Sequence, residues 1–303
     1  MVRTVIDGLI CVGLALFGAA AHGQTVFACE PEWAALARVL LPQAQISVAT
    51  SHQQDPHHIE ARPALIAQLR NADMAVCSGA GLEEGWLPVL QQKSGNARVQ
   101  NGQPGMFWAT AGQALVGRQA SSGSPFEGDV HPEGNPHIHA SPQRLLQAAQ
   151  SMAARMAQVW PAQAPAIEQR LRDFEGRWQA HMGRWQRLAA PLRGGKVAAQ
   201  HTHFAYLWEW LGVQQVADLE PKPGLSPSPA HLQKVAQQLR TMRPPVWGLA
   251  LASHQDARAA RWMGQQVSGL TVWVWPATVT ATGEEDLVRW FDALIADMTR
   301  APS

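Results

Sequence analysis

Residues 167–188 read IEQRLRDFEGRWQAHMGRWQRL, and this stretch sets the organisation of the whole chain. Its large apolar side chains recur every three or four residues, at Ile167, Leu171, Phe174, Trp178, Met182, Trp185 and Leu188. That spacing places them on one face of a single long helix. We therefore predict a stiff connecting helix in the segment 161–192, which ends just before Gly194-Gly195.

On both sides of this helix, short apolar strands alternate with helical stretches. Before it, the pattern predicts strands at 25–29, 45–50, 73–78 and 97–100, with helices at 31–41, 62–70 and 83–92. After it, strands are predicted at 196–200, 215–219, 246–252 and 270–275, with helices at 204–211, 228–242, 256–266 and 284–299. This order favours parallel sheets covered by helices. We expect an α/β fold with an N-terminal lobe at 24–160, which includes a long loop at 101–140, and a C-terminal lobe at 193–303.

The first 23 residues have the pattern of a secretory signal peptide. Arg3 precedes an apolar run from Leu9 to Ala21, and small residues at Ala21 and Gly23 form a cleavage signal. The run is short for a membrane span, although an uncleaved N-terminal anchor is the alternative. The sequence therefore predicts an exported protein that is cut near Gly23.

Charge and cysteine content narrow the class of protein further. The 303 residues carry 24 Lys and Arg against 23 Asp and Glu, so no basic field supports nucleic-acid binding. Cleavage would leave two cysteines, Cys29 and Cys77, each at the end of a predicted strand. In an oxidising compartment such a pair is a disulfide candidate, with two buried free thiols as the alternative.

Histidines gather where the apolar pattern breaks. They form three clusters, at the ends of predicted strands or in the long loop: His57 with His58, then His131, His137 and His139, then His201 with His203. Ligand sites of open α/β sheets form at such strand ends, and converging neutral imidazoles suit Zn²⁺. Each histidine alone is more often a solvated loop residue, and the chain has neither an H-E-x-x-H helix nor a C-x-x-C pair.

Several segments together resemble a known family, the periplasmic zinc- and manganese-binding proteins of ABC importers. The segments that resemble its motifs occur in the family's order along residues 25–295: Asp55-Pro56-His57-His58-Ile59-Glu60, Asp73–Glu83 with Trp86-Leu87, Asn135-Pro136-His137, His201–Leu207 and Glu220-Pro221. Around Cys29 and Cys77 the sequence is similar to a narrower group with paired cysteines.

The resemblance implies two (β/α)₄ lobes bridged by a long helix, with a metal site in the interlobe cleft and ligands at His57, His137 and His201. It implies a monomeric, non-catalytic periplasmic protein that delivers a metal ion to a membrane permease and its ATPase. Manganese members carry a carboxylate at the position matched by His201, so the zinc type is expected here. The alternatives are a protein for Mn²⁺, Cu²⁺ or another divalent ion, a metallochaperone or adhesin, and an exported zinc hydrolase.

The fourth ligand stays open, because Trp275 occupies the position at which many members have Asp. A water molecule is one option. The protein candidates for a fourth or auxiliary ligand are Glu60, His58, His131, His139, His254 and Asp256. Glu60 is also a candidate to orient a ligand imidazole, and in the hydrolase alternative Glu60 or Asp256 would serve as the general base.

Overall fold

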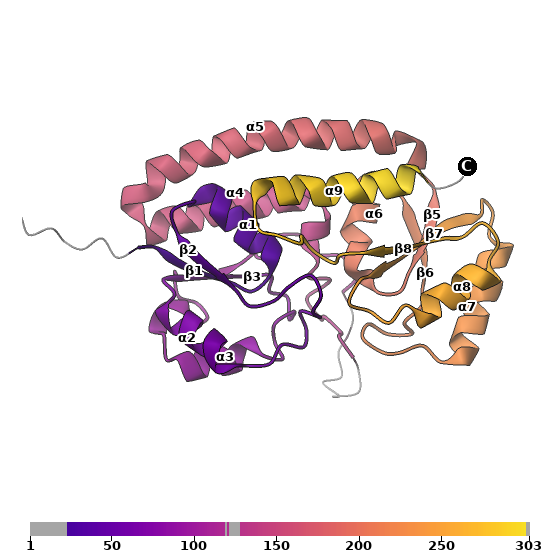
Figure 1. Cartoon of the computed structure of the whole chain (residues 1–303), viewed down its shortest axis with the longest axis horizontal. Helices are drawn as coiled ribbons and strands as arrows, with labels where there is room; N and C mark the ends of the chain where they lie inside the picture. The colour runs from indigo at the N-terminus through magenta and orange to yellow at the C-terminus, as the bar shows by residue number, and fades with distance from the viewer. Residues whose placement is uncertain (1–22, 119, 121–127, 301–303) are drawn as a thin grey trace, which may run out of the picture.

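The computed structural model describes residues 23–118, 120 and 128–300, so the predicted signal peptide lies almost entirely outside the described residues. Within them the chain forms two four-stranded parallel sheets. The first sheet has the order β2-β1-β3-β4 and the second the order β6-β5-β7-β8. The predicted α/β architecture of two lobes and a long helix is confirmed (Figure 1).

The N-terminal sheet is buried on both faces. Its strands are β1 (Thr25–Ala28), β2 (Gln45–Val48), β3 (Met74–Cys77) and β4 (Met106–Trp108). Alternate side chains point to opposite faces, so Val26 packs toward α1 (Pro31–Leu40) while Phe27 packs toward α2 (Pro63–Asn71) and α3 (Leu87–Ser94). Burial on both faces explains why these strands read as continuous apolar runs.

The C-terminal sheet repeats this plan. Its strands are β5 (Lys196–Ala199), β6 (Gln214–Asp218), β7 (Val246–Ala252) and β8 (Thr271–Trp275). One face packs on α7 (Pro229–Thr241) and α8 (Arg258–Gln266), and α6 (Ala205–Leu211) belongs to the core on the other face. In each sheet the second strand lies on one side of the first strand and the third strand lies on its other side. The topological switch points therefore lie between β1 and β3 and between β5 and β7.

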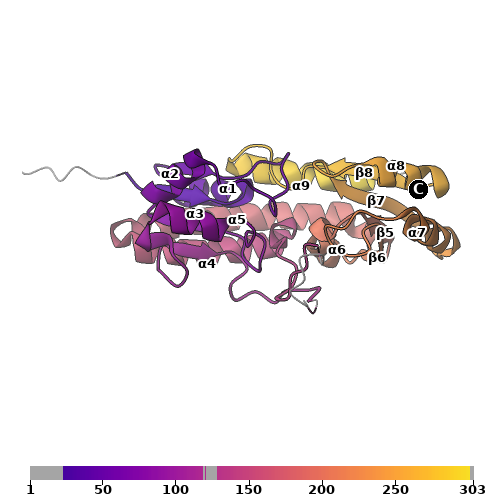
Figure 2. The ribbon, with the colours of Figure 1, turned by 90° about the horizontal axis from the view of Figure 1, so that it is seen from below.

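Three long helices join the lobes along one side of the molecule. They are α4 (Pro142–Val159), α5 (Ala164–Ala189) and α9 (Glu284–Thr299), and α5 runs the length of the molecule above both sheets (Figures 1 and 2). Trp178 and Trp185 of α5 pack on Phe291 of α9, with ring centroids 5.8 and 5.1 Å apart. One hydrophobic core therefore continues from the first lobe into the second, which supports a stiff connection.

The structure corrects three details of the predicted elements. Residues 97–99 form a 3-10 turn rather than a strand, because the Asn96 side chain accepts a hydrogen bond from the backbone N–H of Arg98. The fourth strand lies instead at Met106–Trp108, inside the predicted loop 101–140. The apolar face of α5 continues at Ala189, four residues after Trp185, which leaves Leu188 51% exposed.

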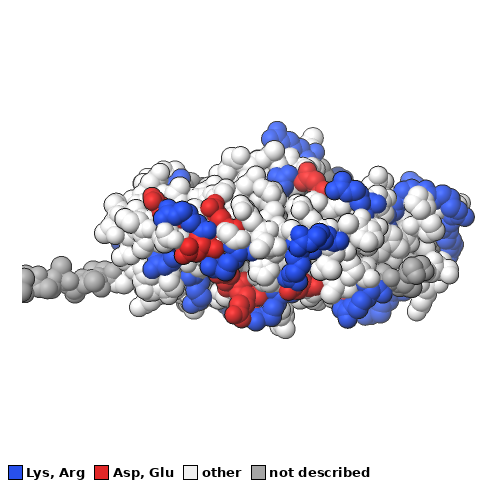
Figure 3. All heavy atoms as spheres, turned by 90° about the horizontal axis from the view of Figure 1, so that it is seen from above, with Lys and Arg blue, Asp and Glu red and all other residues white. Residues whose placement is uncertain are grey.

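The face of the molecule formed by α5 and α9 carries charged side chains of both signs (Figure 3). Acidic and basic side chains lie together over its middle part, and basic side chains predominate at one end. Among the described residues, no helix combines the length and the apolar character that a membrane crossing requires.

Candidate metal centre

Three histidines from distant parts of the chain meet at the boundary between the lobes. His57 lies in the loop after β2, His137 precedes the 3-10 turn η2 (Ile138–Ala140), and His201 follows β5. One ring nitrogen of each lies within 4.8 Å of the other two, and all three side chains are buried. Nitrogens on one tetrahedral zinc ion are about 3.3 Å apart. Small side-chain movements would therefore let all three reach one ion.

Two of these imidazoles are oriented by carboxylates. His57 Nδ1 lies 2.7 Å from Asp55 Oδ1, and His201 Nδ1 lies 2.7 Å from Glu220 Oε2. The same Glu220 oxygen accepts a hydrogen bond from the backbone N–H of Gly224 at 2.8 Å, which fixes the carboxylate. A carboxylate on Nδ1 leaves the Nε2 lone pair for a metal ion and makes the imidazole more basic. Each lobe thus contributes one carboxylate–histidine pair.

The third histidine is positioned through an asparagine. The backbone N–H of His137 donates to Asn135 Oδ1 at 2.9 Å, and Asn135 Nδ2 donates across the lobe boundary to the Thr202 carbonyl at 2.8 Å. The Tyr206 hydroxyl donates to the Asn135 carbonyl at 2.6 Å. These bonds tie His137 of the first lobe to the segment of the second lobe that carries His201.

A fourth imidazole lies beside this cluster. His131 Nε2 is 3.1 Å from His57 Nε2, and the two rings stack with centroids 5.3 Å apart. His131 also forms a hydrogen bond with the backbone of Ala80. The Asp129 N–H of the same segment donates to the Pro223 carbonyl of the second lobe at 2.8 Å, so this segment reaches across the cleft.

His139 is engaged elsewhere. Its Nε2 lies 2.9 Å from the Ala277 carbonyl and its Nδ1 lies 3.1 Å from Glu32 Oε1, and the Thr278 hydroxyl donates to the other oxygen of Glu32. Glu32 and His139 come from the first lobe, and Ala277 and Thr278 from the second. These contacts join the lobes behind the histidine cluster. They engage Nε2 of His139, while its Nδ1 faces the Glu32 carboxylate without a hydrogen-bond partner among the described residues.

The structure does not bring the other predicted auxiliary residues to the cluster. Glu60 is exposed, and it is Asp55 that contacts the His57 ring. Asp256 is exposed and pairs with Arg258. The His58 side chain is 70% exposed and lies 3.6 Å from Asp129 at the rim. None of these three joins the three-histidine group among the described residues.

At the end of β8, Trp275 occupies the position at which many family members have Asp, so this position offers no carboxylate. Trp275 is buried, stacks on Trp273 with ring centroids 4.9 Å apart, and donates from Nε1 to Asp297 at 3.0 Å. The Trp275 ring is therefore part of the hydrophobic core, and it does not replace the family's Asp as a metal ligand.

Two further histidines adjoin the cluster in the second lobe. His203 is buried, and its ring centroid lies 4.4 Å from that of His137 and 4.5 Å from that of His201. His254 follows β7 and lies 5.2 Å from His203. Of this pair, only His254 was among the predicted auxiliary ligands.

Burial favours the neutral form of three of these imidazoles, His131, His137 and His203. It lowers the pKa of His131 to about 3, with a further contribution from the neighbouring His57 and His201. Burial likewise holds the pKa of His137 and of His203 well below its usual range. For Asp55, burial acts to raise the pKa, but the hydrogen bonds from His57 outweigh it and lower the pKa. His131, His137 and His203 thus favour the neutral state, in which imidazole binds metals.

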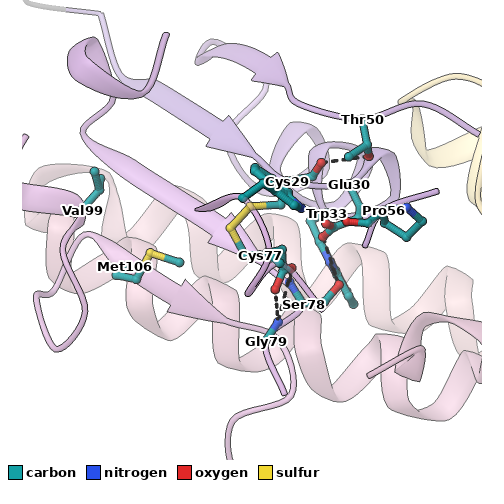
Figure 4. Close-up of a disulfide and its surroundings, with 12 residues drawn as sticks. Cys29, Glu30, Trp33, Thr50, Pro56, Cys77, Ser78, Gly79, Val99 and Met106 are labelled. Atoms are coloured by element: carbon teal, nitrogen blue, oxygen red, sulfur yellow. Dashed lines mark hydrogen bonds between the residues drawn. A yellow bond between two sulfur atoms is a disulfide. The ribbon is translucent and has the colours of Figure 1, made fainter. Parts of the chain in front are cut away.

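The predicted disulfide is confirmed at the first lobe's switch point. Cys29 follows β1 and Cys77 ends β3, and their Cα atoms are 4.8 Å apart (Figure 4). Beside it, Ser78 donates to Glu30 Oε2 at 3.0 Å and Trp33 donates to the Ser78 hydroxyl at 2.8 Å. This region is cross-linked and buried, and the histidine cluster lies outside it.

The residues that hold the histidines in place were not predicted from the sequence. Asp55, Asn135, Tyr206 and Glu220 all occur in the quoted motifs, but no role was given to them. Asp55 stands two residues before His57 and Asn135 two residues before His137. That short spacing is the signal that could have identified them, because a side chain can cap the backbone two residues ahead. Glu220 is 19 residues from His201 and only the pairing of β5 with β6 brings them together.

The chain is similar in sequence to proteins of one known family. The family described as "Zinc-uptake complex component A periplasmic" matches residues 26–301. The high-affinity zinc uptake system protein ZnuA of Yersinia pestis is 23% identical over 195 residues, which cover 61% of this chain and 61% of that protein. The zinc-binding lipoprotein AdcA of Streptococcus pneumoniae serotype 4 is 22% identical over 200 residues, which cover 65% of this chain and 39% of the lipoprotein. The chain thus spans between two and three fifths of these relatives.

Solved structures share the fold. A crystal structure of ZnuA aligns with a TM-score of 0.74 at 18% identity, over 93% of this chain and 100% of that one. The solute-binding protein FpvC from Pseudomonas aeruginosa, solved in complex with Mn²⁺, aligns with a TM-score of 0.72 at 18% identity, over 92% of this chain and 98% of that one. Because the family match extends over nearly the whole described chain, this chain belongs to the family of periplasmic zinc-uptake complex components.

Proposed function

We propose that this chain captures Zn²⁺ outside the cytoplasm through His57, His137 and His201 and delivers it to the permease and ATPase of an ABC importer. The single observation that carries the proposal is the meeting of these three imidazoles, contributed by both lobes, with a carboxylate behind two of them. The family is one of metal-binding solute-binding proteins rather than enzymes.

We infer that His131 supplies the fourth donor. Its Nε2 and the Nε2 of His57 face each other at 3.1 Å, close to the separation of about 3.3 Å expected for two nitrogens on one tetrahedral ion. A fourth imidazole would take the place of the Asp that Trp275 replaces. It would also connect ion capture to the segment from Asp129 to His131, which crosses the cleft.

The donor set supports zinc over manganese. Imidazole nitrogens suit Zn²⁺, Ni²⁺ and Cu²⁺, whereas Mn²⁺ prefers carboxylate and water oxygens. Ni²⁺ is the second candidate, because a nitrogen-only set does not discriminate against it. The curated relatives named above carry zinc in their names, whereas the fold neighbour FpvC was solved with Mn²⁺, so the ion must be tested directly.

The rest of the chain fits a capture protein. We propose that the mature protein begins near Gly23 after removal of a signal peptide and acts as a monomer. The two lobes, 24–160 and 193–303, then hold the ion between them, and the segment 161–192 keeps them in register. Because one core runs through both lobes, we expect capture to involve the cleft segments more than a rotation of whole lobes.

A competitive titration tests the proposal. Metal-free mature protein is titrated with Zn²⁺ against a zinc indicator, beside His137→Ala and a control, His231→Ala, whose residue lies on α7. We expect one tightly bound Zn²⁺ in the wild type and the control, weak binding in His137→Ala, and much weaker binding of Mn²⁺ by all three. Equal zinc affinity in all three proteins would refute the site. Tighter binding of Ni²⁺ than of Zn²⁺ would favour the second candidate.

A further inference from the structure

Two histidines next to the proposed site have ring nitrogens that nothing satisfies. His203 is 3% exposed, and both of its ring nitrogens are buried without a hydrogen-bond partner among the described residues. The same holds for both ring nitrogens of His254. A neutral imidazole carries one donor and one acceptor, and buried polar groups nearly always have partners. Four unpartnered nitrogens in adjacent rings therefore indicate a ligand.

The spacing of the two rings fits one metal ion. Their centroids are 5.2 Å apart, with the planes at 69°. Two imidazoles that share a tetrahedral zinc ion place their ring centroids about 5 Å apart. His203 follows β5 and His254 follows β7, so the pair brackets the switch point of the second sheet, where open α/β sheets place their ligands.

The pair connects an open cavity with the three-histidine cluster, because His254 borders the cavity and His203 packs against the cluster. His254 lines an open cavity of about 560 Å³ at the lobe boundary, together with Asp55, Asp129 and Glu220. His203 lines a small inner cavity with His137 and packs against both His137 and His201. An ion that moves from the open cavity to the three-histidine cluster by way of this pair would meet His254 first and His203 second.

We propose that His203 and His254 form a second, weaker binding position for the same nitrogen-preferring divalent ion, through which it passes on entry and release. The inference rests on the proposed function, since the ion is the captured one. Two nitrogens with water completing the coordination hold an ion less firmly than three or four nitrogens do. Two adjacent dications would repel each other strongly even at a moderate effective dielectric constant, so a single ion occupies the two positions in turn.

Exchange kinetics test this role. Zn²⁺ capture by metal-free protein and Zn²⁺ release to excess EDTA are followed by stopped flow for the wild type, His254→Leu and a control, His231→Leu. We expect the rates of Zn²⁺ capture and release by His254→Leu to fall by the same factor, about tenfold. The variant lacks an intermediate binding position that the ion uses in both directions. His231→Leu should match the wild type.

Two results would overturn the transfer role. Unchanged rates in His254→Leu would place His254 off the path. Faster release with weaker affinity would make His254 a direct ligand of the main ion. Thermal unfolding of each variant shows whether it is folded, and His254→Asn replaces His254→Leu if the latter is not.

A second measurement isolates the weaker position. The double variant His57→Ala/His201→Ala lacks two proposed main ligands, and we expect it to retain one weakly bound Zn²⁺ that is lost when His254→Leu is added. Absence of residual zinc binding in the double variant would contradict a binding position at His203 and His254. A wild type that binds no Zn²⁺ would instead refute the proposed function, so the two failures are distinguishable.

Discussion

The switch points of the two sheets occupy equivalent places in one repeated topology, yet they hold different chemistry. Between β1 and β3 of the first lobe lie the disulfide of Cys29 and Cys77 and the buried carboxyl groups of Glu30 and Glu83. Between β5 and β7 of the second lobe lie His201, His203 and His254. The same backbone thus builds a cross-linked, buried end in one lobe and a set of nitrogen donors in the other.

Burial also shifts the pKa values of the side chains at the two switch points in opposite directions. Burial raises the pKa of Glu83 to about 7 and raises that of Glu30 well above its usual range, which favours the protonated form of both acids. Burial lowers the pKa of His203 and of His254, which favours the neutral form of both bases. Burial thus favours the neutral form of the acids and of the histidines, but only the histidines present nitrogen lone pairs to a cation. The second switch point therefore differs from the first in its donor atoms and not in its topology.

The largest effect should come from removing a donor at the second switch point. We expect His201→Ala to weaken Zn²⁺ binding by about a thousandfold or more, because one nitrogen is lost and the Glu220 carboxylate loses its imidazole partner. Isothermal competition titration measures the change. Zinc affinity within a factor of three of the wild type would place the ion elsewhere.

Breaking the first switch point should affect stability instead. The disulfide closes a sequence separation of 48 residues, and the double variant Cys29→Ser/Cys77→Ser should lose about 2–4 kcal/mol of unfolding free energy. Denaturant unfolding measures this loss. Zinc affinity of the folded variant should stay close to that of the wild type, and a large loss of affinity would show that the two switch points are coupled.

The buried acids predict a pH dependence of stability. Unfolded Glu83 releases its proton near its ordinary pKa of 4.5, whereas the folded group holds it to about pH 7. The folded state therefore binds more protons in this window, and the contribution of Glu83, up to about 3 kcal/mol, is lost as the pH rises through it. Glu83→Gln should reduce this slope and leave the part that Glu30 contributes, and chemical unfolding at several pH values records the change. Substitution of the exposed neighbour in Glu84→Gln should leave the slope intact. A slope in Glu83→Gln equal to that of the wild type would assign it to another group.

The smallest effect should come from a carboxylate that only orients a donor. Glu220→Gln keeps the shape of the side chain but removes its charge from His201 Nδ1, and we expect zinc affinity to fall about 10- to 100-fold. Glu209→Gln, at the surface on α6, is the matched control. An affinity equal to that of the control would show that the carboxylate has no influence on the ion.

Periodicity was sufficient to predict most of the fold. β7 and α9 lie at the residues that the apolar pattern predicted, because each is long and has one clear period. β4 was missed because it is only three residues long and stands beside Pro104 and Gly105, where local signals indicate a loop. Its strand character comes from pairing with β3 and not from its own sequence.

The site was predictable only in part. His57, His137 and His201 could be nominated from motifs, and the structure brings them together. The placement of His131 beside His57 depends on how the segment after residue 127 crosses the cleft, which no local pattern encodes. The engagement of His139 with Glu32 and Ala277 depends on contacts across 107 and 138 residues of sequence, so spacing alone could not separate it from a ligand.

We propose above all that one ion binds among His57, His137 and His201, between the two lobes and beside the switch point of the second sheet. Crystals of the zinc-loaded mature protein, measured on both sides of the zinc absorption edge, test this most directly. We expect a principal anomalous peak within bonding distance of a ring nitrogen of each of these three histidines, with His131 as the fourth neighbour. A principal peak bound by surface carboxylates, or at any position that lacks two of the three histidines, would contradict it.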